Sequence, residues 1–216
     1  MKHFISFAMI VTVWSSACFA QSRYIELHQN AIGFDVGYST DKNRDIDGIT
    51  GTLGYSSWGL LDLGISLSRV SVQGFYGGKD YTSTISPYLS YLIVKQDAVN
   101  PISLGLSASY QETITENSEV VGSHIAIGPG FFTDLRISNE FFMQPNANFA
   151  ILVGKSKKMY SNNERLEQNN SMFLANIGLS LVFVNADESI LAINPAVAFQ
   201  KDITLFGLSA SMLFLL

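Results

Sequence analysis

The most constraining feature of this chain is the strict alternation in residues 61–68, which read LDLGISLS. Large apolar residues occupy every second position, and small or polar residues lie between them. Successive side chains of a β-strand point to opposite faces, so this segment is expected to form a strand with one apolar and one polar face. The same alternation recurs almost to the end of the chain. The sequence therefore predicts an all-β protein with a single domain.

The composition indicates that part of the protein surface does not face water. Charged residues make up 14% of the chain and hydrophobic residues 47%, whereas a soluble globular protein carries roughly 25% charged residues. Beyond residue 20, no uninterrupted apolar run reaches the ~20 residues that a membrane-spanning helix needs. Membrane-spanning strands are therefore favoured over helices. The formal net charge of -5 argues against nucleic acid as a partner.

The N-terminus predicts export. Lys2 provides a short positive region, residues 4–14 are apolar, and a small-residue segment ends at Ala20. This order is typical of a signal peptide over residues 1–20, which leaves a mature domain at 21–216. A competing interpretation makes Cys18 a lipidated first residue, but the preceding Ser-Ser-Ala lacks the large aliphatic residue of such signals. The mature chain then contains no cysteine, which suits an oxidising periplasm.

Ten strands are predicted, and long polar connections follow the first, third, fifth and seventh of them. The strands cover residues 32–38, 49–55, 61–69, 81–94, 102–110, 121–132, 141–151, 173–183, 190–199 and 203–214. The long connections are residues 40–47, 73–80, 111–119 and 155–170. Long loops on one side and short turns on the other are typical of even-stranded outer-membrane barrels. Hydrocarbon offers backbone polar groups no partner, so such strands must close into a barrel.

The export signal and the alternating segments together resemble the small Gram-negative outer-membrane β-barrel proteins. The resemblance is one of pattern over the whole mature chain, without the motif of a specific family. It implies a closed, antiparallel up-and-down barrel in the outer membrane, which the barrel-assembly machinery would fold. Aromatic side chains are expected at the membrane boundaries, namely Tyr38, Tyr55, Trp58, Tyr81 and Tyr110.

Two features depart from this pattern. Proteins of this class commonly end on an aromatic residue, whereas this chain ends Phe-Leu-Leu. Pro87, Pro129, Pro145 and Pro195 lie inside predicted strands, where each removes a ladder hydrogen bond. Bulges would accommodate them, and a count of eight or twelve strands is the alternative. A soluble periplasmic ligand-binding β-barrel, with its apolar faces turned inward, also stays open.

Polar residues on the predicted inner faces are candidates for a role in the lumen: Asp35, Asp62, His124, Gln144, Asn146 and Asn148. The two aspartates would either tune a narrow cation path or join a polar interior network. His124, projecting inward beside Ser123, would suit a Ser-His-Asp hydrolase, but a hydrogen-bonded lumen histidine is the simpler interpretation. Because metal-ligand spacing, a phosphate loop and a nucleophile elbow are all missing, we expect no catalysis, no cofactor and no metal.

The basic residues gather in one predicted loop and at one strand end. Lys155, Lys157, Lys158 and Arg165 fall in the predicted 155–170 loop. If that loop lies outside the cell, it would contact lipopolysaccharide phosphates; the alternative is a solvated loop that also contains acidic residues. Arg69 has lipid-side parity at the end of its strand, and we expect its charged end to snorkel to the interface.

The sequence as a whole predicts an outer-membrane β-barrel with a structural, loop-displaying or narrow-pore role. Its expected surroundings are outer-membrane lipid and lipopolysaccharide. The alternative functions are a small-solute channel, a lipid-modifying outer-membrane enzyme and a soluble ligand-binding protein. Ten strands enclose little more than the eight whose interior side chains just fill, so a wide porin-like channel is not expected.

Overall fold

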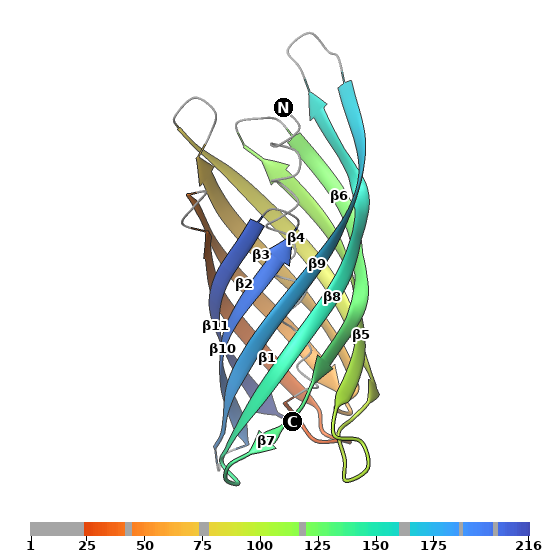
Figure 1. The fold of residues 1–216 in the computed structure, drawn as a ribbon, viewed down its shortest axis with the longest axis vertical. Helices are drawn as coiled ribbons and strands as arrows, with labels where there is room; N and C mark the ends of the chain where they lie inside the picture. The colour runs from red at the N-terminus through yellow and green to blue at the C-terminus, as the bar shows by residue number, and fades with distance from the viewer. Residues whose placement is uncertain are drawn as a thin grey trace.

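The computed structural model describes residues 24–41, 45–73, 78–116, 120–159, 165–185, 188–200 and 203–216. The predicted signal peptide lies outside these ranges. Within them all regular structure is β-strand (Figure 1). No described helix is long and apolar enough to cross a membrane. The strands are β1 (Ala31–Asp41), β2 (Ile46–Ser57), β3 (Leu61–Gln73), β4 (Lys79–Val94), β5 (Ser103–Thr115), β6 (Val120–Phe132), β7 (Leu135–Arg136), β8 (Phe141–Met159), β9 (Arg165–Val184), β10 (Ser189–Gln200) and β11 (Ile203–Leu215).

The strands form a closed antiparallel barrel. Each long strand pairs with its neighbours in sequence, β1 pairs with β11, and β6 pairs with β8 across the short β7. The two-residue β7 pairs only with β8 and belongs to the connection between β6 and β8. Ten strands therefore make the wall, as the alternation predicted, and counts of eight and twelve are wrong.

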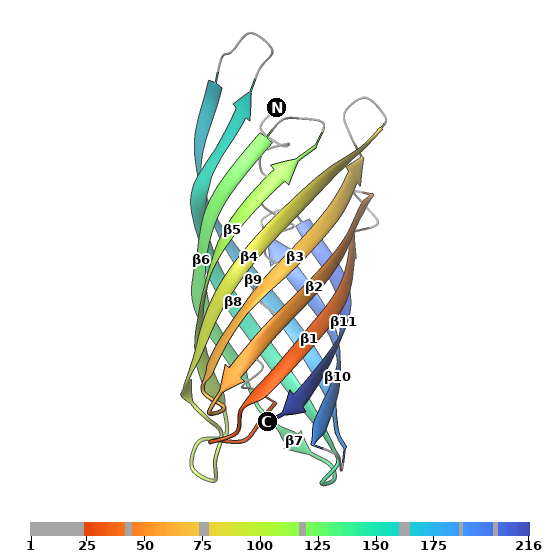
Figure 2. The same cartoon turned by 180° about the vertical axis from the view of Figure 1, so that it is seen from behind.

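The barrel has two distinct ends (Figures 1 and 2). At the end that we call the terminal end, β1 begins and β11 finishes, with Ala31 opposite Leu215. The opposite end is called the hairpin end, because the β8–β9 pair rises there above the neighbouring strands in both views. The register of β8 with β9 continues without a break from Phe141↔Phe183 to Met159↔Arg165.

Strand extends into all four predicted long loops. β1 and β2 run into the predicted 40–47 loop, β5 continues to Thr115, and β8 and β9 take up most of residues 155–170. The predicted loop bounds were too wide because they followed the apolar alternation, which stops at the membrane boundary; residues 42–44, 74–77, 117–119 and 160–164 lie outside the described residues. Backbone pairing does not require an apolar outer face where that face meets water. Polar cross-strand contacts replace it, as in the outer-face ion pair of Lys157 Nζ with Glu167 Oε1 at 3.0 Å.

The four internal prolines fit the wall without changing its register. Pro87 lies opposite Ile65 of β3, whereas the pairing of β4 with β5 skips residues 86–87 and resumes in the same register. The ladders similarly skip Pro129 on the β8 side and Pro195 on the β9 side. The β6–β8 pairing ends beside Pro145, at Asn146. Each proline thus lies at a local gap in one ladder, and neither a bulge nor a miscount is involved.

The outer face is apolar and the inner face largely polar. In β1, for example, Ile32, Phe34 and Val36 are exposed on the outside, while Asp35 and Ser39 are buried inside. Outward valine, leucine, isoleucine and phenylalanine side chains repeat around the barrel, many with 40–60% of their surface exposed. A continuous apolar face of this kind is expected to be covered by hydrocarbon. The soluble alternative, with this face turned inward, is wrong.

Candidate functional site: the closed interior of the barrel

The structure places the predicted lumen residues on the inner wall. Asp35, Asp62, His124 and Gln144 are buried, with at most 4% of each residue exposed. Asn146 and Asn148 also face inward and are half-buried. Serine and threonine make up most of the other buried polar residues, so the polar part of the interior carries few charges.

A chain of hydrogen bonds crosses this interior to Asp35. Ser211 Oγ donates to Asp35 Oδ2 over 2.7 Å, and Asn194 Nδ2 donates to Ser211 Oγ over 2.9 Å. The Tyr24 hydroxyl donates to Asn194 Oδ1 over 2.8 Å and lies 3.1 Å from Ser180 Oγ. Hydrogen bonds to a carboxylate are among the stronger ones in proteins. The chain therefore connects Asp35 of the wall to a residue that precedes the first strand.

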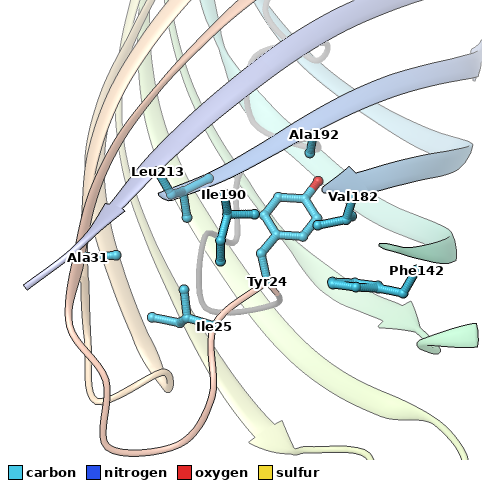
Figure 3. Packing of buried hydrophobic residues seen from close by; sticks show 8 residues of the cluster. All are labelled: Tyr24, Ile25, Ala31, Phe142, Val182, Ile190, Ala192 and Leu213. Atoms are coloured by element: carbon cyan, nitrogen blue, oxygen red, sulfur yellow. The ribbon is translucent and has the colours of Figure 1, made fainter. Parts of the chain in front are cut away.

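The segment at residues 24–30, which we call the N-terminal plug, packs into the terminal end of the lumen. Tyr24 is 7% exposed and Ile25 only 2%. Figure 3 shows both side chains inside the barrel among apolar residues from distant parts of the wall. This cluster comprises Tyr24, Ile25, Ala31, Phe142, Val182, Ile190, Ala192 and Leu213. Burying each of its large side chains contributes about 1.5–3 kcal/mol relative to leaving it exposed.

Polar contacts fix the plug to the turns of the terminal end. Lys95 Nζ donates to the Ile25 carbonyl oxygen, and burial lowers the pKa of this ammonium group. The His28 amide donates to the Trp58 carbonyl over 3.0 Å, and the Trp58 amide donates to Asn30 Oδ1 over 2.9 Å. These hydrogen bonds give partners to backbone groups of the plug and of the β2–β3 turn.

Gly59 lets the plug approach the β2–β3 turn. Its φ of 63° lies in the left-handed region, and a Cβ atom there would clash with the Glu26 carbonyl. Glycine is the residue that tolerates both the conformation and the close contact. The Glu26 carboxylate lies 3.5 Å from the Arg136 guanidinium, but both side chains are mostly exposed, so this ion pair contributes little.

Tyr88 fills the lumen beside the two aspartates. A Cβ added to Gly64 would lie 2.5 Å from three atoms of the Tyr88 side chain, so its ring lies across the glycine. Gly33, Gly54, Gly64 and Tyr88 form one cross-strand row. The absence of side chains along this row makes room for the ring inside the barrel.

His124 and Ser123 point to opposite faces of β6. The histidine is 2% exposed inside the wall, and neither ring nitrogen has a hydrogen-bond partner in the part of the chain that the structure describes. Its ring lies over Gly122, where an added Cβ would be 2.6 Å from the His124 Cε1. Ser123 is exposed on the outer face, because neighbours in a strand point to opposite sides. The expectation that the two lie side by side in the lumen was wrong.

A second apolar cluster packs on the inner wall at the hairpin end. It consists of Ile46, Val70, Ala198, Ile203 and Leu205. Its members lie near the hairpin ends of β2, β3, β10 and β11, on both sides of β1. The polar interior therefore has apolar packing at each end.

The chain was compared with known proteins. No protein-family model and no curated protein sequence matches it. The translocator domain of the autotransporter NalP from Neisseria meningitidis superimposes with a TM-score of 0.56 at 10% identity, over 86% of this chain and 87% of that one. The β domain of the Bordetella autotransporter BrkA has a TM-score of 0.47 at 11% identity, covering 88% and 99%. The outer-membrane protease OmpT from Escherichia coli has 0.43 at 8% identity, covering 87% and 95%.

The likeness to the NalP domain and the apolar outer face decide the fold. The chain is an outer-membrane β-barrel. At such low identity the likeness concerns the fold alone and carries no activity over to this protein.

The aromatic residues predicted at the boundaries of the outer-membrane barrel lie towards its two ends. Tyr38, Tyr81 and Tyr110 are near the hairpin end, where the Tyr38 hydroxyl donates to Asp47 Oδ1 over 2.6 Å. Tyr55 and Trp58 are at the terminal end. Trp58 is 59% exposed, with its ring edge-on to His28 at 5.5 Å between centroids.

The predicted basic loop is part of the β8–β9 pair. Lys155 and Lys157 are exposed on its outer face, and Lys157 Nζ lies 3.0 Å from Glu167 Oε1. Lys158 and Arg165 belong to the strands, opposite Leu166 and Met159, and their side chains lie outside the described part. The expectation of a loop was wrong here, because the register continues to the end of the hairpin.

Sequence reasoning missed the plug. Tyr24 and Asn194 are 170 positions apart, and no local pattern relates them. One local sign of the plug is the apolar Tyr24-Ile25 pair just before the first predicted strand. Judged by alternation alone, this pair looks like a weak start of that strand. The Lys95 contact is equally hidden from the sequence, since its carbonyl partner on Ile25 is just as remote.

Proposed function

We propose that this outer-membrane β-barrel is a non-catalytic, non-conducting wall protein that displays the β8–β9 hairpin on the outside of the cell. The observation that carries the proposal is the N-terminal plug, whose Tyr24 and Ile25 are buried among wall residues at the terminal end. In even-stranded outer-membrane barrels the short turns face the periplasm. The plug then closes the periplasmic mouth, and the hairpin projects outward.

Burial of the lumen charges supports a closed interior. Asp62 has no exposed surface and Asp35 has 4%, whereas residues that line a water-filled channel contact water. A barrel of this size has little space to spare once its interior side chains are in place. Asp35 is hydrogen-bonded to Ser211, which fits a structural network better than an ion path.

Conductance across planar bilayers tests the proposal. The wild-type protein should give no steady conductance, and Tyr24→Ala should open a small leak because it removes the ring that fills the terminal end. Tyr55→Ala, at the same end but outward-facing, is the matched control and should stay closed. Steady conductance of the wild type that Asp35→Asn alters would instead establish the small-solute channel.

The absence of catalysis is part of the same proposal. It is supported by the opposite orientations of Ser123 and His124, which separate the hydroxyl from the imidazole that would activate it. Lipid A from cells that overproduce the protein should have an unchanged mass spectrum. A new lipid A species that His124→Ala abolishes would contradict this part and favour a lipid-modifying enzyme.

We further propose that lipopolysaccharide contacts the outer face of the β8–β9 hairpin. Lys155 supports this, because it is exposed at the next outward position of β8 after the apolar Val153. It lies opposite Ser123 of β6 and Asn169 of β9. A cation at this level attracts phosphate within a Debye length. Lys155→Gln should weaken retention of lipopolysaccharide during purification, and equal retention would contradict the contact. The barrel-assembly machinery is the partner expected during folding.

A further inference from the structure

The outer wall contains a groove that the closed interior does not explain. It has a volume of about 690 Å³, far larger than the ~30 Å³ that one water occupies. Its lining comes from β1 to β5, which lie side by side at the front of Figure 2. Two cross-strand rows of outward residues border it. One row is Ile49, Arg69, Ser83 and Ile114, and the other is Val36, Gly51, Leu67, Ile85 and Glu112.

Small residues in these rows create the groove. Gly51 faces outward, and a Cβ atom added to it would have no neighbour within 4 Å. Ser83 is the other small member, next to Arg69 in its row. The surrounding aliphatic side chains are well exposed, Ile49 at 61% and Leu67 at 57%. The groove is thus an apolar hollow within the lipid-facing belt, with a shape that suits part of an acyl chain.

The rim of the groove carries charges of both signs. Arg69 Nη2 lies 3.0 and 3.3 Å from the two carboxylate oxygens of Glu116, which leaves Nε and Nη1 for a second acceptor. The guanidinium carbon lies 4.8 Å from the centre of the Tyr81 ring, on the side toward the hairpin end. Glu112 is exposed and accepts a 3.0 Å hydrogen bond from the Tyr110 hydroxyl. A headgroup with one phosphate and one ammonium group complements this rim.

We propose that the groove is a binding site for one zwitterionic phospholipid, with an acyl chain over Gly51, its phosphate at Arg69 and its ammonium group at Glu112 and Glu116. The site lies on the outside of the wall, so the inference goes beyond the closed interior and does not depend on it. It also differs from the proposed lipopolysaccharide contact, which lies on β8 and β9.

Native mass spectrometry of the detergent-solubilised protein tests the site with three lipids that share the same acyl chains. Phosphatidylethanolamine carries both charged groups, phosphatidylglycerol lacks the ammonium group, and diacylglycerol lacks the phosphate. The wild type should bind phosphatidylethanolamine most tightly. Gly51→Phe should weaken that binding about tenfold, as expected when an aromatic ring displaces an acyl segment from an apolar groove.

Further variants separate the parts of the site. Ser171→Phe adds the same ring to an exposed outward position on β9, opposite Val153 of β8, away from the groove on β1 to β5, and should leave binding unchanged. Arg69→Gln should remove the preference for phosphatidylethanolamine over diacylglycerol. Glu112→Gln should reduce the preference for phosphatidylethanolamine over phosphatidylglycerol. A heat-shifted electrophoretic band confirms that each variant is folded. Equal binding by Gly51→Phe and Ser171→Phe, or equal binding of the three lipids to the wild type, would overturn the proposal; neither result bears on conductance.

Discussion

The two ends of this barrel are stabilised in different ways. At the terminal end, the plug buries Tyr24 and Ile25 and makes hydrogen bonds to turns between several strands. At the hairpin end, β8 and β9 continue as a two-stranded ribbon in which exposed contacts such as Lys157 with Glu167 accompany the backbone ladder. Isolated two-stranded hairpins are marginal in water. The comparison teaches that the plug is held by packing inside the terminal end, whereas the β8–β9 ribbon, which extends beyond the apolar cluster of the hairpin end, should tolerate change and suits display.

The largest effect should come from removing the plug's aromatic ring. Tyr24→Ala deletes a buried side chain and its hydrogen bonds to Asn194 and Ser180, and should lower the free energy of unfolding by about 3–5 kcal/mol. Denaturant unfolding in lipid vesicles measures it. Tyr55→Ala, which removes an outward ring at the same end, should cost much less. Equal losses would mean that the plug does not stabilise the barrel.

Adding one methyl group inside the wall should have the next largest effect. Gly64→Ala forces the Tyr88 ring away from the inner wall and should cost about 1–3 kcal/mol, as overpacking does. Gly51→Ala is the matched control, because its added methyl meets open space and should change the stability by less than about 0.5 kcal/mol. The same unfolding experiment compares them, and a neutral Gly64→Ala would contradict the packing of Tyr88 against the wall.

A charge change on the hairpin should have a small effect. Lys157→Ala breaks the exposed pair with Glu167 and should change the free energy of unfolding by less than about 1 kcal/mol. Raising the salt concentration should shrink the difference further. A loss as large as that of Tyr24→Ala would show that the two ends do not differ as described.

The smallest expected effect is local and depends on pH. The amides of Asn100 and Val99 donate to Asp97 in the connection after β4, and these hydrogen bonds lower the pKa of its carboxyl group. Because the pKa of Asp97 is lower in the folded protein, its ionised carboxylate stabilises the connection at pH values above the unfolded-state pKa of about 3.9. This stabilisation is lost as the pH falls through the folded-state pKa. Hydrogen exchange of the two amides, corrected for its intrinsic pH dependence, should lose protection at acidic pH. Asp97→Ala should show the low protection at every pH.

The sequence predicts which face of a strand a side chain occupies, but not which remote residues it contacts. Alternation assigns Asp35 and Asp62 to the inner face and Leu63 to the outer face, because the period of two needs no knowledge of partners. It fails where the outer face meets water, so it predicts a loop at Lys155 and Lys157, where the strand continues. It also fails for contacts that closure creates between distant segments. Asn194 meets Tyr24 only because the segment before β1 turns into the closed barrel.

The central claim is that the barrel's own N-terminal segment closes its terminal end, and cysteine labelling tests it most directly. The variants are Ile25→Cys and Trp58→Cys, each in a chain with Cys18→Ser so that no other cysteine is present. Ile25 is 2% exposed and Trp58 is 59% exposed at the same end. A water-soluble maleimide should label position 58 rapidly, and position 25 only after denaturation. Equally rapid labelling of both in the folded protein would contradict the closure.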